Sequence, residues 1–307
     1  MGKAAKLPKH NRFCAIKAAS WFFTSLAFVA VTAGLILLLV ESIPVWRHSG
    51  LEFITGRNWF YRAREFGALP MIYGSLQVAV IAILIAAPIA VGAAIFGTEF
   101  LSGRLRIGLK IVIELLAGIP SVIYGLLGIL LLRNWVYDSM ESLDILSGDT
   151  LLTAGILLAV MILPTIMTLA DDALQSVPRA QRMAARSLGL TATETAINIS
   201  LRGAFPGLIA AVLLAMGRAL GETIAVFLVV GRQDNQLPES LFSFQPLVES
   251  GQTLTSKLGG SETNIAYGEP LHWGAMLGLG ILLMIMVTAL TFAGLGLQNL
   301  ARRKNET

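Results

Sequence analysis

Apolar residues form six long stretches of the chain, and polar or charged segments separate them. A helix needs roughly 20 residues to cross about 30 Å of hydrocarbon, and these stretches approach or exceed that length with very few charges inside. We therefore predict six transmembrane helices, at about 18–40, 66–98, 115–132, 150–170, 207–230 and 273–301. The predicted fold class is an all-α integral membrane protein.

Basic residues are divided unevenly between the segments that connect these spans. If the N-terminus is cytoplasmic, the inner segments hold fifteen of the 23 basic residues and the outer segments hold seven. Cytoplasmic segments usually carry the excess of lysine and arginine, so we predict that both termini are cytoplasmic. The sequence pI of about 9.4 then reflects orientation in the membrane. We expect contact with membrane lipid and no nucleic-acid partner.

The composition excludes an ordinary soluble protein, because only 14% of the residues are charged and 55% are hydrophobic; soluble domains carry about 25% charged residues. The basic start of the chain resembles a signal peptide. The apolar stretch that follows is too long for one, however, and no small-residue cleavage site ends it. We expect this stretch to remain as the first span.

Several kinds of chemistry are not supported by the sequence. The single cysteine, Cys14, cannot form an internal disulfide, and the three histidines are too scattered to indicate a metal site. No G-x-x-x-x-G-K-[ST] phosphate loop is present, since the nearest string, 103–110, has leucine after its second glycine. We therefore expect no cofactor, no ATPase site and no enzymatic activity of its own.

The predicted cytoplasmic connection, 171–205, has the pattern of two helices joined by a glycine turn. Ser176 and Pro178 are typical of a helix start, and Gly189 is typical of a helix end. Thr191 and Glu194 form a capping box that starts the second helix. An apolar stripe follows one face of the first helix: Val177, Ala180, Ala184 and Leu188. From the pattern alone, this hairpin lies on the membrane surface, packs on its own protein, or docks a soluble partner.

The fifth predicted span carries two charges, Arg218 and Glu222. Arg218 lies about 18 Å along this span at 1.5 Å per residue, near the bilayer centre, where a charge costs about 2.5–3.5 kcal/mol on insertion scales. The spacing of four residues places both side chains on one face of a continuous helix, where we expect them to neutralise each other.

Two interpretations of this pair remain open at this point. It is either a structural ion pair or part of an ion pathway in which the arginine meets a crossing anion. An arginine fork suits phosphate-type oxyanions, and Gly217 and Gly221 bracket Arg218 and permit close helix approach. A carboxylate at Glu222 would accept a hydrogen bond from protonated phosphate and repel sulfate, which is a hypothesis about selectivity.

Part of the cytoplasmic connection resembles the EAA loop of ABC-importer permeases, in which a short coupling helix sits in a groove of an ATPase subunit. The resemblance implies that the ATPase contact includes Met183, Ala184, Ala185, Leu188 and Gly189. Met183 stands where the family has a glutamate, which departs from the pattern but leaves the helix–glycine–helix arrangement intact.

Two longer strings resemble the PstC-type permease subunit of phosphate ABC importers, within the binding-protein-dependent transport permease family. They are GRALGETIAV at 217–226 and ELLAGIPSVIYG at 114–125, and the resemblance runs from about residue 70 to 300. It implies a type I, MetI-like importer core in the last five spans. The implied division is a first span with its external loop (1–65), a permease domain (66–301) and a basic tail (302–307).

The resemblance also implies roles for individual residues and partners. It assigns substrate translocation to three residues: Arg218, Glu222 and Thr223. It places three others in a wall or gate of the pathway: Glu114, Pro120 and Ser121. By pattern alone, Pro120 is a packing kink and Glu114 makes an interfacial or inter-helix hydrogen bond. The implied partners are a PstA-like permease subunit, a PstB-like ATPase dimer and an external PstS-like phosphate-binding protein, at a bacterial plasma (inner) membrane.

Other functions compete with the expected phosphate importer. The nearest alternative is a permease for another oxyanion, such as molybdate or sulfate. An ATP-independent channel or proton-coupled carrier would need no ATPase subunit. A purely structural membrane subunit would need the charged pair only for assembly.

Overall fold

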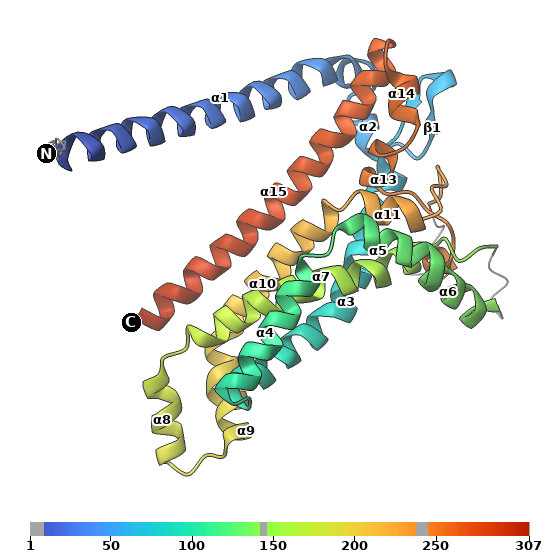
Figure 1. Ribbon diagram of the computed structural model, residues 1–307. Coiled ribbons are helices and arrows are strands. Elements are labelled where there is room, and N and C mark those ends of the chain that lie inside the picture. The colour runs from blue at the N-terminus through green and yellow to red at the C-terminus, as the bar shows by residue number, and fades with distance from the viewer. Residues whose placement is uncertain (1–8, 142–145, 238–244, 307) are drawn as a thin grey trace, which may run out of the picture.

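In the computed structural model, which describes residues 9–141, 146–237 and 245–306, the chain is almost entirely helical (Figure 1). Five helical stretches of this described part are long and apolar enough to span a membrane, and a bent pair of helices makes a sixth. The long elements are α1 (Lys9–Ser49), α3 (Leu69–Glu99), α7 (Leu151–Gln175), α10 (Arg202–Leu220) and α15 (Pro270–Glu306). The predicted class, a six-span all-α membrane protein, is confirmed.

Shorter elements complete the chain between the long helices. One end of the bundle carries α2 (Glu52–Thr55), β1 (Trp59–Phe60), η1 (Tyr61–Ala63), β2 (Glu65–Phe66), α13 (Leu254–Leu258) and α14 (Glu262–Ala266); we call it the hairpin end. The opposite end carries α8 (Arg179–Ser187) and α9 (Ala192–Thr195); we call it the α8 end. The remaining elements are α4 (Gly103–Ala117), α5 (Ser121–Leu127), η2 (Gly128–Leu132), α6 (Arg133–Ser139), η4 (Ala196–Leu201), α11 (Ile224–Val229) and α12 (Gln245–Val248).

The centre of the bundle is the pair α3 and α7, which make the most extensive helix–helix contact. Small residues let helices approach closely in a membrane, where packing replaces the hydrophobic effect. A stripe of buried alanines marks the packed face of α3: Ala79, Ala82, Ala86, Ala90 and Ala94. On α7, Gly155 lies directly against Ile81. The close pairing therefore follows from small side chains at three- and four-residue spacing.

The first span is peripheral, as predicted. Helix α1 packs on α15, but Figure 1 shows the two helices diverging away from the hairpin end. Its most apolar window is unburied within this chain, and large side chains such as Trp21 and Phe28 are exposed. At the hairpin end, by contrast, Val45 of α1 is fully buried in an apolar cluster with Phe53 and Met71.

The third predicted span is wrong as a straight helix over 115–132. Helix α4 ends at Ala117, and the following helix starts at Ser121 after a bend of 83°. Pro120 has no backbone N–H to donate to a preceding carbonyl and fits poorly into a continuing helix. The bend therefore falls at Gly118–Pro120, and the predicted kink at Pro120 is a complete break.

The fifth predicted span, 207–230, is also interrupted. The membrane-length helix runs over Ala192–Leu220, through α9, the π-helical turn η4 and α10. It stops at Gly221, and a separate short helix, α11, starts at Ile224. The span therefore begins earlier than predicted and breaks directly after the Gly217–Leu220 turn.

We predict that Gly74→Ala destabilises the bundle, because a methyl group at this α3 position would overlap with the Gln252 backbone carbonyl. Overpacking of this kind costs about 1–3 kcal/mol. Thermal unfolding of the detergent-solubilised protein should therefore shift to lower temperature. Gly92→Ala is the matched control on the same helix, since nothing lies within 4 Å of a Cβ there. Equal midpoints for the two variants would contradict the packing described.

Candidate functional site

Arg218 lies in the last turn of α10, just before the break of the fifth span. The backbone N–H of Gly221 ends the helix by donating to the carbonyls of Gly217 and Arg218. A helix C-terminus carries a partial negative charge, which favours a cation in its last turn. The break therefore places a guanidinium at a helix end that stabilises it, within the fifth predicted span of 207–230.

The Arg218 side chain is exposed on the surface of this chain. Its Nη1 donates a hydrogen bond of 2.7 Å to Thr165 Oγ1 of α7. Within the described residues, no carboxylate oxygen lies within 4.0 Å of it. The predicted neutralisation by Glu222 is therefore wrong. The prediction assumed a continuous helix, but the helix ends between the two residues.

Glu222 and Thr223 occupy the break itself and are half-buried. Glu222 Oε1 lies 3.5 Å from the backbone nitrogen of Ala225, in the first turn of α11. This carboxylate thus faces a helix N-terminus, where negative charge is favoured. The backbone carbonyl of Thr223 accepts from the Phe227 N–H. A Cβ at Gly259, beside α13, would lie 3.1 Å from Thr223 Cγ2.

The two helices that follow the two breaks pack against each other. A Cβ at Gly125 of α5 would lie 3.2 Å from Ala225 Cα of α11, and a Cβ at Gly128 would lie 2.8 Å from Val229. Successive positions along α5 and the start of η2 therefore meet successive positions of α11, so the two segments run in the same direction. The breaks before Ser121 and before Ile224 consequently lie at the same end of this pair.

The predicted wall or gate residues lie around the first of these breaks. Pro120 is the residue before α5 and is exposed, and Ser121 is the first residue of α5 and half-buried. Glu114 lies on α4, before the bend, with an exposed side chain. Among the described residues it makes no side-chain hydrogen bond or ion pair, so an inter-helix hydrogen bond of Glu114 is not found there, and an interfacial one stays a prediction.

Helix α8 presents most of the predicted ATPase-contact residues on its surface. Met183 is 64% exposed and Leu188 82% exposed, and Ala184 and Gly189 are exposed as well. Ala185 is the exception, because it is buried against the protein. Of the predicted apolar stripe, only Val177 is covered. An apolar face left open on a short polar helix is typical of a docking surface.

Local hydrogen bonds define both ends of this hairpin. Gly189 has φ +89°, and the Gly189 and Leu190 N–H groups donate to the carbonyls of Arg186 and Ala185, which is a Schellman ending. The capping box of Thr191 and Glu194 is present as predicted. The predicted Ser176 cap is wrong, because its hydroxyl donates to the Ala173 carbonyl of the preceding helix; Pro178 precedes the first residue of α8.

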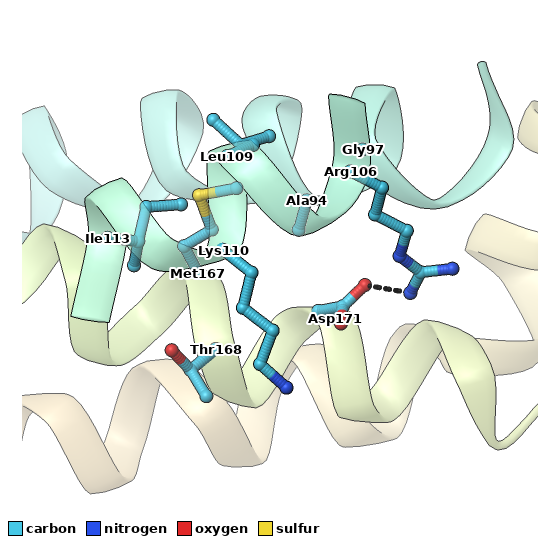
Figure 2. Close-up of a pocket in the computed structure, with 9 residues that line it drawn as sticks. All are labelled: Ala94, Gly97, Arg106, Leu109, Lys110, Ile113, Met167, Thr168 and Asp171. Carbon is cyan, nitrogen blue, oxygen red and sulfur yellow. Dashed lines mark hydrogen bonds and ion pairs between the residues drawn. The ribbon is translucent and has the colours of Figure 1, made fainter. Parts of the chain in front are cut away.

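A pocket of about 390 Å³ lies between α3, α4 and α7 near the α8 end (Figure 2). Its rim carries Arg106, whose Nη2 lies 2.7 Å from Asp171 Oδ1, and Asp171 also accepts from Thr98 at 2.6 Å. Lys110 and Thr168 lie along the same pocket, and the rest of its lining is largely apolar. None of the predicted site residues lines this pocket, so it is separate from the break at Arg218.

Comparison with known proteins identifies the family. The model of the family described as "Binding-protein-dependent transport system inner membrane component" matches residues 82–306. This chain belongs to that family.

Individual relatives are similar over most of their length. The probable ABC transporter permease protein YqgH of Bacillus subtilis is 37% identical over 262 residues, 85% of this chain and 81% of the relative. The phosphate transport system permease proteins PstC of Haemophilus influenzae and Mesorhizobium japonicum are each 34% identical. The first match covers 87% of this chain and 86% of the relative, and the second covers 77% and 75%.

A solved structure shares the fold of this permease. A chain of the MetNI methionine ABC transporter, in inward facing conformations, matches with a TM-score of 0.52, over 77% of this chain and 94% of that chain. The sequence identity is 18%, so this likeness concerns the fold alone. It supports the predicted MetI-like importer core.

The permease also has a buried ion cluster at the hairpin end, which the sequence analysis did not find. Lys257 is 2% exposed, and its Nζ lies 2.6 Å from Asp234 Oδ2 and 2.5 Å from Glu262 Oε2. Glu262 Oε1 accepts from Trp59 Nε1 at 2.6 Å and lies 2.9 Å from His272 Nε2. The cluster joins the 231–272 connection to β1 and to α15.

These contacts change the acidity of Glu262. Burial by itself would raise the pKa of this carboxyl, but hydrogen bonds from Lys257, Trp59 and His272 and the charge of Lys257 hold the pKa below its ordinary value of 4.5. A carboxyl whose folded pKa is lowered stabilises the fold above its ordinary pKa. That stabilisation is lost as the pH falls through the lowered value.

We predict that Glu262→Gln lowers the thermal midpoint of the detergent-solubilised permease at pH 7, by an amount equivalent to about 3 kcal/mol. The reason is that loss of one partner leaves the buried Lys257 charge undercompensated. The difference from wild type should shrink as the pH falls from 4.5 through the lowered pKa of Glu262, because the folded wild-type carboxyl gains its proton there. Glu65→Gln, at an exposed carboxylate on β2, should have no effect. A pH-independent difference would contradict the assignment.

Proposed function

We propose that this permease is one transmembrane subunit of an ATP-driven phosphate importer and forms half of its translocation pathway. Membership in the permease family and the relatives named as phosphate transport system permeases support this function. The single observation that carries it is the state of Arg218: exposed, held by a neutral hydroxyl, and free of any carboxylate among the described residues.

The absence of an ion pair makes Arg218 better suited to an anion than the sequence alone indicated. If Arg218 were paired with Glu222, the guanidinium would have to release that carboxylate before it could bind the substrate anion. Thr165 instead fixes one nitrogen of the fork and leaves the guanidinium without a carboxylate partner among the described residues. Charge-assisted hydrogen bonds contribute about 1.5–3 kcal/mol each, and an arginine fork fits an oxyanion with two of them.

The remaining half of the pathway comes from a partner in this proposal. Arg218 lies on the outer surface of this single chain, where a bare guanidinium in lipid would be costly. A related, PstA-like permease subunit packed against this face would turn the surface into a pore. The resemblance of 217–226 to the translocation segment of PstC-type subunits supports the same assignment for Arg218, Glu222 and Thr223.

The two ends of the bundle receive different soluble partners. The open face of α8 suits the groove of a PstB-like ATPase, two copies of which would hydrolyse ATP, since this chain lacks a phosphate loop of its own. The hairpin end would receive phosphate from an external PstS-like binding protein. The distribution of basic residues favours a cytoplasmic α8 end and cytoplasmic termini in a bacterial plasma membrane.

We predict that Arg218→Gln lowers phosphate import at least tenfold, because one charge-assisted contact to the anion is lost. The measurement is phosphate-dependent ATPase activity and uptake of the complex, reconstituted with its permease and ATPase partners. Arg202→Gln, in the first turn of the same helix, is the matched control and should retain activity. Normal import by Arg218→Gln would overturn the proposal, and a reduced complex yield with normal activity per complex would indicate a structural role.

We further predict that Glu222→Gln weakens discrimination against sulfate. The carboxylate accepts a hydrogen bond from protonated phosphate and repels fully ionised sulfate, whereas an amide does neither as strongly. Competition of sulfate and molybdate against labelled phosphate uptake measures the change. Unchanged exclusion of sulfate, with full phosphate transport, would count against this role for Glu222. Stronger competition by molybdate in the wild type would favour the alternative oxyanion.

A further inference from the structure

Glu99 is the last residue of α3 and contacts both α8 and η4 through its side chain. The proposed function assigns this residue no role. Its side chain is 2% exposed. Its carboxylate lies 3.4 Å from Arg182 Nη1 and 3.8 Å from Arg186 Nη2, both on α8. Ser200, on η4, donates to the same carboxylate at 2.6 Å. One buried side chain therefore joins three segments that are far apart in the sequence.

This junction fixes α8, which has little else to hold it against the transmembrane bundle. The helix has nine residues, and isolated helices of that length are marginal in water. Its open face includes Met183, Ala184 and Leu188, and its main packing partners are the neighbouring α9 and η4. Arg182 also donates to the Leu174 carbonyl, at the end of α7. Two arginines of α8 thus reach the ends of the two central helices.

The outward face of α8 contributes no carboxylate of its own, because Met183 stands where the EAA pattern has glutamate. The acidic partner for its arginines comes from α3 instead. Arg182 is largely covered, with 16% of its side chain exposed, and the Glu99 side chain is covered almost completely. A carboxylate and a guanidinium so little hydrated hold each other firmly, since separating them leaves uncompensated buried charge.

From this geometry we propose that Glu99 is the positioning residue that passes displacement of α8 to the transmembrane helices. This inference rests on the proposed function, in which an ATPase moves α8. A displacement of α8 would pull on α3 through Glu99. Helix α3 is closely packed along α7, and α7 carries Thr165, which holds Arg218. The contacts therefore form an unbroken physical connection from the docking helix to the proposed anion site.

The test is Glu99→Gln in the complete complex with its co-expressed permease and ATPase partners, reconstituted into liposomes. The amide keeps the volume of the side chain and an acceptor for Ser200, but it removes the charge that holds both arginines. We expect the amount of phosphate imported per ATP hydrolysed to fall at least fivefold, with copurification of the ATPase unchanged. Glu99→Asp, which keeps the charge, should recover at least half of the wild-type ratio.

The matched control is Asp172→Asn, at an exposed carboxylate of α7 that makes no side-chain contact among the described residues. It should leave the ratio unchanged. An assembled Glu99→Gln complex with a wild-type ratio would overturn the proposal. If the Glu99→Gln complex fails to assemble, Arg186→Gln is the deciding variant, because the Arg186 side chain is 51% exposed and contributes less to folding. We expect Arg186→Gln to lower the ratio of phosphate imported to ATP hydrolysed at least twofold. An unchanged ratio would again refute the proposal.

The wild-type complex in the same assay tests the proposed function separately. Wild-type ATPase activity that does not respond to phosphate or another oxyanion would refute the proposed function, whatever the variants do. Wild-type transport with an unaffected Glu99→Gln variant would refute only the role of Glu99.

Discussion

A hydrocarbon environment offers no water to satisfy backbone groups or charges, and this constraint governs the arrangement of the whole chain. Interruptions within membrane-length helices are tolerated only where protein or a polar cavity meets the freed groups. The described residues of this permease include two, at 118–120 and 221–223, and the helices that follow them, α5 and α11, pack against each other. The two interruptions, where backbone groups are costly to leave unsatisfied in hydrocarbon, therefore lie at the same end of the α5–α11 pair.

This gathering explains why the charged residues lie where they do. A helix that ends at Leu220 offers its carbonyl end to Arg218, and a helix that starts at Ile224 offers its amide end to Glu222. The two charges therefore have separate sources of stabilisation and need not pair. Because they stay apart, the positive charge of Arg218 is exposed on this chain, with the neutral Thr165 as its partner among the residues that the structure describes. A structural ion pair would leave no such free charge.

Local patterns in the sequence were sufficient to predict that six apolar spans exist, the glycine ending at Gly189 and the capping box at Thr191, but not the breaks in the third and fifth spans. Each of these depends on residues within one or two turns of each other. The pairing of Arg218 with Glu222 failed because it assumed helix continuity across Gly221, and the spacing rule has no meaning across a break. The junctions at Glu99 and Lys257 could not be predicted, because their partners come from distant segments and only packing brings them together. The one local signal for such a junction is a charged residue at the boundary of a predicted span, which is where Glu99 lies.

The two ends of the bundle are held by different sets of contacts, and this difference bears on how an importer of this fold would move. At the hairpin end, Lys257, Glu262 and His272 are tied to β1 and α15 by contacts of 2.5–2.9 Å around a fully covered lysine. At the α8 end, Glu99 accepts from Ser200 at 2.6 Å and lies 3.4 and 3.8 Å from two arginines of α8, while the outward face of that helix is open. In the proposed function, force enters through this single buried carboxylate and meets the ion cluster of the hairpin end. The strain would then be absorbed where backbone hydrogen bonds are already missing, at the two helix breaks, which is also where Arg218 would meet the anion.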